Sequence, residues 1–201
     1  MVQTPSAMLP LGTRAPDFDL LEPATGRMRS LADFKAPTLV VMFICNHCPF
    51  VIHVRDEITR LERDYARRGV DFVAINSNDV DKYPQDGPDH MAALVREVGW
   101  KFPFLLDRTQ EAGRAYHAAC TPDFFVFDAA RCLRYRGQLD DSRPSNGRPV
   151  TGADLRAAID AVMSGKAAAA EQRPSIGCNI KWKPGNEPDY FTSFLAARKS
   201  G

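Results

Sequence analysis

The segment Cys45-Asn46-His47-Cys48-Pro49 constrains the fold of this chain most, because it places two thiols between a predicted strand and a predicted helix. Before it, residues 38–44 form a short apolar run rich in β-branched side chains, which is typical of a strand buried on both faces. After it, apolar residues recur at spacings of three and four as far as Tyr65, as in an amphipathic helix. Two thiols three residues apart at a helix start favour redox chemistry over simple packing.

The two cysteines are expected to play different roles. Pro49 suits the first position of the helix, because the N–H that proline lacks would have no partner there. Cys48 then lies at the helix cap, where unpaired backbone N–H groups stabilise a thiolate. Cys45, at the exit of the strand, is stabilised less by these N–H groups. We therefore expect Cys48 to attack, to be alkylated fastest, and to be resolved by Cys45; the alternative is a pair of buried, inert cysteines.

Composition excludes several classes of function. The formal net charge of +1 lacks the excess of Lys and Arg expected of a nucleic-acid-binding protein. No apolar run reaches the roughly 18 to 20 residues that span a bilayer, and residues 1–10 lack the features of a signal peptide. We expect a cytoplasmic protein that binds neither nucleic acid nor a membrane. Five cysteines, an odd number, favour thiol or metal chemistry over a framework of structural disulfides.

Three segments are expected along the chain. Residues 1–11 contain two prolines and no periodic pattern, so we predict a flexible arm. Residues 12–165 alternate strand and helix patterns and form the main domain. Residues 166–201 are interrupted by proline and glycine, but side chains such as Trp182 make them too apolar for a free linker. We expect this C-terminal extension to pack on the domain.

The first half of the domain is predicted to contain an edge strand, a short second strand, a helical turn and two central strands, in residues 12–21, 27–29, 30–34, 38–44 and 70–75. The helix after Cys48 joins the central strands by a right-handed crossover, so these strands should be parallel. Gly69 is expected to cap that helix. The polar loop 76–88 should lie near the carboxyl ends of the sheet, where loops often border sites.

The second half is predicted to contain a helix from Asp89 to Gly99, a helix capped by Thr109, a hairpin of residues 124–127 and 132–137, and a last helix with capping-box spacing at Thr151 and Asp154. Residues 102–106 contain Pro103, so we expect them at an edge of the sheet or outside it. In the second hairpin strand, Arg134 and Arg136 alternate with apolar residues and should face solvent.

This order of elements resembles the thioredoxin fold. Within it, Ala15-Pro16-Asp17-Phe18 and the turn at residues 31–34 look like the alkyl hydroperoxide reductase and thiol-specific antioxidant branch of the peroxiredoxins. The Cys-Asn-His-Cys-Pro motif, Thr121-Pro122 and residues 175–182 together look like uncharacterised peroxiredoxin-like members of the thioredoxin family. The resemblance implies an α/β fold with a central mixed sheet flanked by helices, an N-terminal β extension and an irregular C-terminal tail. It also implies a thiol–disulfide oxidoreductase or antioxidant enzyme.

The resemblance further implies a cis peptide at Thr121-Pro122, with the Thr121 backbone presented to a bound disulfide and Pro122 against Cys48. Two departures from the family patterns matter. Aligned on the strand aromatic, the second thioredoxin cysteine would stand at Val51. The proline, threonine and arginine of a peroxiredoxin pocket would stand at Val41, Cys45 and Pro122. Peroxide reduction is therefore expected to be slow.

Other residues add to the predicted redox site or suggest a different function. His47 adjoins Cys48 and is expected to bind substrate or move a proton, or else to be an ordinary turn residue. Cys178 and Cys120 are candidates for additional redox thiols, with packing as the alternative for each. A second function is a Cu- or Zn-binding module using Cys45, Cys48 and His47, with His53 less well placed.

For the redox reading we expect neither a cofactor nor a bound metal. The expected partners are protein or small-molecule disulfides, peroxides as slow substrates, a thioredoxin or glutathione system as reductant, and a second copy of the chain in a homodimer.

Overall fold

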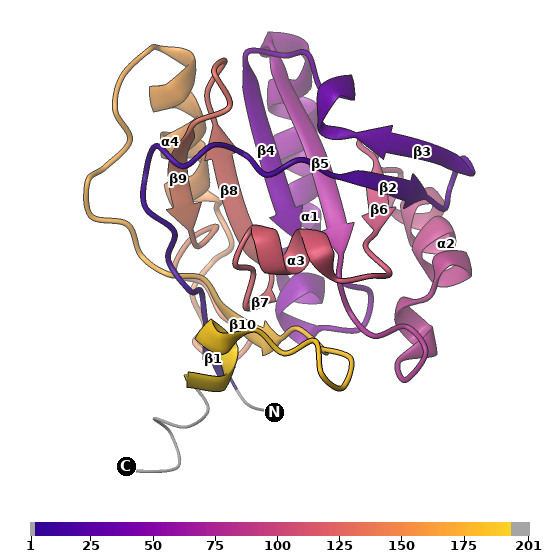
Figure 1. Ribbon diagram of the computed structural model, residues 1–201. Helices are drawn as coiled ribbons and strands as arrows, with labels where there is room; N and C mark the ends of the chain where they lie inside the picture. The colour runs from indigo at the N-terminus through magenta and orange to yellow at the C-terminus, as the bar shows by residue number, and fades with distance from the viewer. Residues whose placement is uncertain (1–2, 194–201) are drawn as a thin grey trace.

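The computed structural model describes residues 3–193 and is built on a seven-stranded mixed sheet (Figure 1). The strand order is β3-β2-β6-β5-β4-β8-β9. Strands β4, β5 and β6 are parallel, and the other neighbours pair antiparallel. The strands are β2 (Asp19–Glu22), β3 (Arg27–Ser30), β4 (Thr38–Phe43), β5 (Val70–Asn76), β6 (Phe104–Leu106), β8 (Asp123–Phe127) and β9 (Leu133–Gly137).

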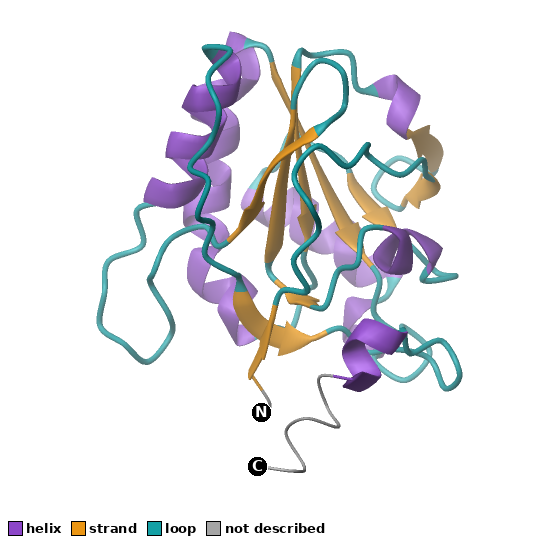
Figure 2. Ribbon diagram, turned by 60° about the vertical axis from the view of Figure 1, so that its left-hand side comes forward, coloured by secondary structure: helices purple, strands orange, loops and turns teal. Residues whose placement is uncertain are grey.

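Helices cover both faces of this sheet, as Figure 2 shows from the side. One face carries α1, α2 and α4, and the other carries α3 together with parts of the N- and C-terminal segments. The helices are α1 (Pro49–Tyr65), α2 (Pro88–Val98), α3 (Glu111–Ala115) and α4 (Ala153–Met163). The short 3₁₀ helices are η1 (Leu31–Asp33), η2 (Ala66–Arg68) and η3 (Pro84–Asp86). None of the described helices is long and apolar enough to cross a bilayer.

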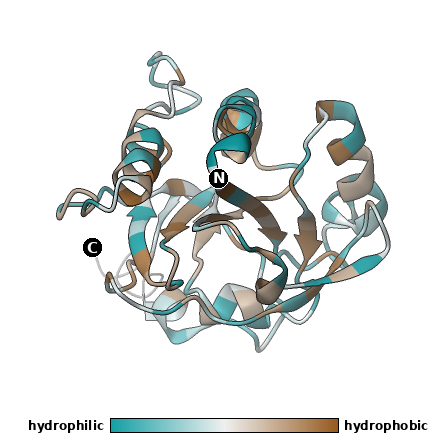
Figure 3. Cartoon of the chain, turned by 90° about the horizontal axis from the view of Figure 1, so that it is seen from above, coloured by the Kyte–Doolittle hydropathy of each residue, from teal (hydrophilic) through white to brown (hydrophobic). Residues whose placement is uncertain are grey.

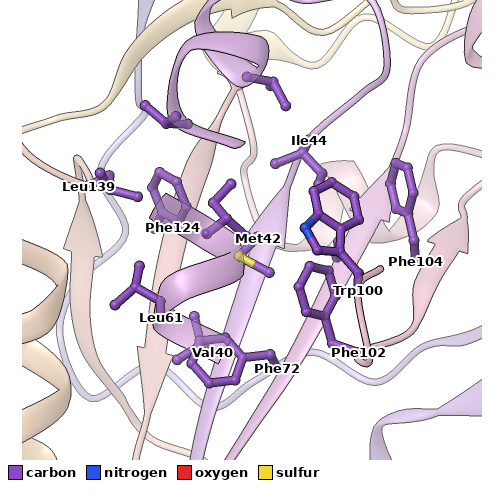
Figure 4. Packing of buried hydrophobic residues seen from close by; sticks show 14 of the residues in the cluster. Val40, Met42, Ile44, Leu61, Phe72, Trp100, Phe102, Phe104, Phe124 and Leu139 are labelled. Carbon is purple, nitrogen blue, oxygen red and sulfur yellow. The ribbon is translucent and has the colours of Figure 1, made fainter. Parts of the chain in front are cut away.

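The continuous apolar run in β4 is explained by its two buried faces, since every residue from Thr38 to Phe43 is buried. Val40 and Met42 face α1, α2 and α4, whereas Val41 and Phe43 face α3. Figure 4 shows Met42 and Ile44 in the hydrophobic cluster on the face that α1, α2 and α4 cover. The strands are mostly hydrophobic in Figure 3, and the helices carry both colours, as amphipathic helices on a buried sheet should.

A second, three-stranded sheet differs from the sequence prediction of a flexible arm over residues 1–11. Its strands are β1 (Gln3–Pro5), β10 (Ile176–Asn179) and β7 (Cys120–Thr121), in that order and antiparallel. Figure 1 shows it at the end toward which β4 and β5 point. Residues 3–5 are ordered because β10, more than 170 residues away in sequence, supplies their hydrogen-bonding partners; residues 1 and 2 lie outside the described part.

From Ile180 onward the C-terminal extension lies on the face that α3 covers, and its residues 194–201 are outside the described part. Ile180, Trp182 and Phe191 are buried in the same cluster as Phe43 of β4. The extension therefore contributes to the core as well as to the small sheet.

Strand β6 corrects a second expectation, since it pairs with both β5 and β2 and is not at an edge. Pro103 removes no hydrogen bond from this strand, because the strand begins one residue later, at Phe104. The Pro103 carbonyl also accepts a hydrogen bond from the N–H of Ala74, at 2.9 Å.

A third prediction, that Arg136 faces solvent, is wrong, because the residue is fully buried. Its guanidinium donates to Asp123 Oδ2 at 3.0 Å, to the His117 carbonyl at 2.7 Å and to the Ala7 carbonyl. The ring of Phe125 lies 4.6 Å below it. The N-terminal segment covers this side of the hairpin, so an alternation that suits an open sheet here surrounds a buried ion pair.

Three helix starts also differ by one or two residues from the prediction. The cap residues are Gly87, Gln110 and Gly152 rather than Asp89, Thr109 and Thr151. At α4 the capping box does not form, because Asp140 Oδ2 accepts the Thr151 and Gly152 N–H groups and Asp154 accepts from Gln138. The helix predicted to end at Gly99 does end there, and Gly99 has a left-handed φ of 78°.

Candidate active site

Cys48 occupies the N-cap of α1, with Pro49 at the first helical position as the sequence predicts. Its backbone is extended, with φ −69° and ψ 121°, and its carbonyl accepts the Ile52 N–H at 3.0 Å. The side chain is 0% exposed, whereas Cys132 is only partly buried. Burial therefore opposes the expectation that Cys48 is alkylated before every other thiol, since Cys132 is the more accessible.

Three thiols meet at this cap. Cys45, Cys48 and Cys178 are buried in one cluster, and both Cys45 and Cys178 make side-chain hydrogen bonds with Cys48. As a thiol, Cys48 donates to the Thr121 carbonyl oxygen at 3.1 Å. Cys45 Sγ lies 3.5 Å from Thr121 Oγ1. None of the five cysteines is paired in a disulfide.

The pKa values of these three thiols shift in opposite directions. Hydrogen bonding from Cys178, and then from Cys45, holds the pKa of Cys48 far below its ordinary value, although burial opposes this. The same bonds, together with burial, raise the pKa values of Cys45 and Cys178. The nearby Asp86 carboxylate further raises the pKa of Cys45. Of the three thiols, Cys48 has its pKa lowered, and its two neighbours have theirs raised.

Asp86 is a site residue that the sequence reasoning missed. Its side chain is fully buried, and it accepts the Asn46 and His47 N–H groups at 2.9 and 3.2 Å. It also contacts His47 Nδ1 at 2.6 Å and accepts from Asn78 Nδ2 at 2.8 Å. The carboxylate therefore fixes both the backbone of the cysteine turn and the imidazole ring.

His47 is held between this carboxylate and an aromatic ring. Its ring stacks on Tyr83 with an interplanar angle of 4° and a centroid distance of 5.8 Å. A His47 ring nitrogen, Cys45 Sγ and an Asp86 oxygen lie within 4.8 Å of one another. The imidazole thus lies beside Cys45 within the active turn, where it can exchange a proton.

The loop that supplies Asp86 follows β5, at the carboxyl end of the sheet. The sequence prediction placed loop 76–88 there but named none of its residues as a site residue. Asn76 Nδ2 donates to the Asp86 carbonyl at 2.8 Å, which holds η3 against the end of the strand. A polar loop after a buried strand was the available signal, but several acidic residues share it.

The Thr121-Pro122 peptide is cis, which confirms the prediction. Pro122 separates β7 in the small sheet from β8 in the large one. The expectation that the Thr121 backbone is open to a bound disulfide is not met, because Thr121 pairs with Cys178 of β10. The backbone edge beside Cys48 is occupied by this chain's own C-terminal extension.

Other predicted candidates lie apart from the thiol cluster. Cys120 Sγ contacts the carbonyl oxygens of Pro122 and Ser175, at 3.7 and 4.0 Å, and burial raises its pKa. His53 Nε2 lies 2.7 Å from Ser142 Oγ, on the side of α1 that borders a small pocket with Pro122. The metal set predicted from sequence was Cys45, Cys48 and His47. The structure instead groups Cys45 and His47 with Asp86.

Comparison with known proteins identifies the fold and family of the chain. A family model described as Redoxin matches residues 10–155. A crystal structure of an uncharacterized conserved protein from Geobacillus kaustophilus is 54% identical, with a TM-score of 0.90, and the match covers 92% of this chain and 98% of that one. A hypothetical protein from Sinorhizobium meliloti is 51% identical over 90% of this chain and 100% of its own, with a TM-score of 0.88.

A thiol:disulfide interchange protein of the thioredoxin family from Chlorobium tepidum shares the fold at 20% identity and a TM-score of 0.59. That match covers 78% of this chain and 99% of the other. No curated protein matches the sequence significantly.

Proposed function

Because the chain belongs to the Redoxin family and has a thioredoxin-like, peroxiredoxin-like fold, we propose that it is a thiol–disulfide oxidoreductase in which Cys48 is the nucleophile and Cys45 resolves the intermediate. The observation that carries this proposal is the thiol arrangement at the cap of α1. Cys48 has a strongly lowered pKa, and it is hydrogen-bonded to a neighbouring thiol whose pKa is raised.

The reaction proceeds in two exchange steps. The Cys48 thiolate attacks one sulfur of a disulfide, the bond between the two substrate sulfurs breaks, and the first substrate thiolate leaves. Cys45 then loses its proton and attacks Cys48 Sγ, which expels the second substrate thiolate. The substrate disulfide is reduced to two thiols, and Cys45 and Cys48 are oxidised to a disulfide. An external dithiol or glutathione system returns both cysteines to thiols.

The second step needs a proton acceptor, because the pKa of Cys45 is raised. His47 and Asp86 are the titratable groups that lie with Cys45, with their ligand atoms within 4.8 Å of one another. We assign proton removal from Cys45 to His47, with Asp86 holding the ring through its 2.6 Å contact with Nδ1. The cost of burying Asp86 is offset by the hydrogen bonds that its carboxylate accepts from Asn46, His47 and Asn78.

Peroxides are proposed as slow substrates. Thiolate attack on a peroxide requires donors that polarise the O–O bond. The positions that would carry peroxiredoxin groups hold Val41, Cys45 and Pro122. We propose a reducing compartment, the cytoplasm, because Cys48 can attack only while it is not held in a disulfide.

Turnover of a mixed disulfide of glutathione, with a thioredoxin or glutathione reductant supplied, tests this function. The wild type and Cys132→Ser should turn over equally. Cys48→Ser should lose activity. Without the reductant, Cys45→Ser/Cys178→Ser should stop as a glutathione adduct on Cys48, visible by mass spectrometry, because both neighbouring thiols are absent. Retained turnover in Cys48→Ser would exclude the proposed nucleophile.

Metal binding is a second candidate, favoured by the grouping of Cys45, His47 and Asp86. A thiolate, an imidazole and a carboxylate form a ligand set that suits Zn²⁺. Metal analysis of protein purified without a His tag distinguishes the two functions, together with thiol titration before and after peroxide. Stoichiometric zinc that is lost in Cys45→Ser but kept in Cys132→Ser would support the metal function.

A further inference from the structure

Strand β10 lies where an extended substrate peptide could bind. The β7 strand offers backbone N–H and C=O groups beside Cys48, and such an edge is a ready template for another strand. In this structure β10 pairs with it antiparallel, with Cys178 opposite Thr121 and Asn179 opposite Cys120. The carbonyl oxygen of Thr121 is also the oxygen that lies 3.1 Å from Cys48 Sγ.

The register places a cysteine of β10 against the nucleophile. Cys178 is 4% exposed, lies in the cluster that contains Cys45 and Cys48, and makes a side-chain hydrogen bond with Cys48. A substrate strand that paired with Thr121 in the same register would bring its own sulfur to this place.

Gly177 shows that the close approach of β10 depends on the residue type there. A Cβ at Gly177 would lie 2.0 Å from the Thr121 carbonyl oxygen and 2.6 Å from its carbon, closer than real Cβ contacts. Any side chain at this position would force the two strands apart. The absence of a side chain is what allows Cys178 to reach Cys48 along the paired backbones.

The segment is also held on its outer side. Strand β1 pairs with the other edge of β10, with Gln3 opposite Cys178. Ser175 donates its N–H to Ser6 Oγ at 3.1 Å and its hydroxyl to the Gly137 carbonyl at 2.6 Å. Beyond the strand, the Lys181 carbonyl accepts the Asp79 N–H at 2.7 Å.

We propose that β10 is an internal substrate strand, and that Cys178 is a third redox thiol that forms a reversible disulfide with Cys48. This inference rests on the proposed function, since it requires Cys48 to be the nucleophile. It adds that a protein substrate must displace β10 before its backbone can pair with Thr121. A small disulfide reacts with Cys48 after a smaller opening.

The exchange balances with a small-molecule disulfide such as oxidised glutathione as the oxidant. The Cys48 thiolate attacks one glutathione sulfur, the S–S bond breaks, and one glutathione leaves as a thiolate that takes up a proton. Cys178 loses its proton to solvent and attacks Cys48 Sγ, which expels the second glutathione. Two protein thiols are oxidised to the Cys48–Cys178 disulfide, and the oxidant is reduced to two thiols. When Cys45 attacks Cys48 in turn, Cys178 is released as a thiol, so the oxidation passes from one pair to the other.

The test uses full-length Cys45→Ser and Cys45→Ser/Cys178→Ser proteins treated with oxidised glutathione, with disulfides mapped by mass spectrometry without reduction. The first protein should form the Cys48–Cys178 disulfide. The second should retain glutathione on Cys48, with an adduct about tenfold or more abundant than in the first, because no neighbouring thiol displaces it. Cys45→Ala replaces Cys45→Ser if the serine variant does not fold, and Cys45→Ser/Cys132→Ser is the matched control, which should behave as Cys45→Ser.

Two results would overturn the proposal, and they differ in what else they exclude. If glutathione stays on Cys48 in folded Cys45→Ser while Cys178 remains a thiol, Cys178 is not a redox partner, and the proposed function still stands. If Cys48 acquires no glutathione in any of the proteins, the nucleophile assignment fails, and the internal substrate strand fails with it.

Discussion

Replacing Gly177 by alanine should open the active site without removing any reactive group. In the present backbone the new Cβ would lie 2.0 Å from the Thr121 carbonyl oxygen. Ordinary contacts of this kind begin at about 3.4 Å, so β10 must move away from β7 by more than 1 Å. Such a shift breaks the pairing of Cys178 with Thr121.

The size of the effect follows from the cost of overpacking. Forcing extra atoms into a close-packed contact costs typically about 1–3 kcal/mol. Since every 1.4 kcal/mol is a factor of ten, the population with β10 detached should rise by roughly five- to hundredfold. Cys48 is 0% exposed in the closed form, so its labelling rate should rise by a similar factor.

The assay is the rate of iodoacetamide labelling at each cysteine, resolved by mass spectrometry of the peptides. Cys132 is partly exposed already and serves as an internal reference whose rate should not change. Ile176→Ala changes an exposed side chain of the same strand and is the matched control. Unchanged Cys48 labelling in a folded Gly177→Ala protein would refute the idea that β10 restricts access to the nucleophile.

Further predictions concern the two exchange steps, the buried ion pair and peroxide reduction. His47→Asn should leave the first exchange step nearly unchanged but slow resolution by Cys45 by about 10²-fold or more, the usual size of a general base contribution. Rapid-quench measurement of the Cys48 adduct in Cys178→Ser proteins, where Cys45 alone can resolve it, checks this, and equal slowing of both steps would point to a structural role. The rate at which Cys48 attacks a disulfide should change little between about pH 6 and 8, because its lowered pKa keeps it a thiolate. The rate of attack by an ordinary thiol of pKa about 8.5 would instead fall about tenfold for each unit of pH below that value. The Cys45 step should instead rise with pH, because its raised pKa leaves it protonated near neutrality; a flat profile for Cys45 and a steep one for Cys48 would reverse the roles. Arg136→Met should destabilise the fold by about 3–5 kcal/mol in urea unfolding, because it leaves the buried Asp123 without its cation, and a loss below about 1 kcal/mol would contradict this account of the pair. Hydrogen peroxide should be consumed slowly, and rapid consumption that depends on Cys48 would mean that other donors replace the groups missing at Val41 and Cys45.

The parts of this protein that were predictable from sequence depend on local patterns. The apolar run of β4, the spacing of three and four in α1 and the proline after Cys48 each reflect residues that are close in the chain. These patterns place Cys48 at the helix cap and Cys45 at the strand end. The resemblance carried by Thr121-Pro122 supplied the cis peptide, which no periodic pattern indicates.

The parts that were missed depend on residues far apart in sequence. Residues 3–5 become a strand only because β10 lies beside them, and Arg136 is buried only because residues near Ala7 cover it. Asp86 reaches His47 across 39 positions. No local pattern distinguishes this aspartate from its acidic neighbours in the same loop, so its role emerges only when the chain is folded.

The assignment of Cys48 as the nucleophile is tested most directly by mapping disulfides in the wild-type protein after brief oxidation with oxidised glutathione. We predict that every disulfide formed early contains Cys48, joined first to glutathione and then to Cys178 or Cys45. Early disulfides that leave Cys48 as a thiol, such as glutathione on Cys45 or a Cys45–Cys178 pair, would contradict the assignment.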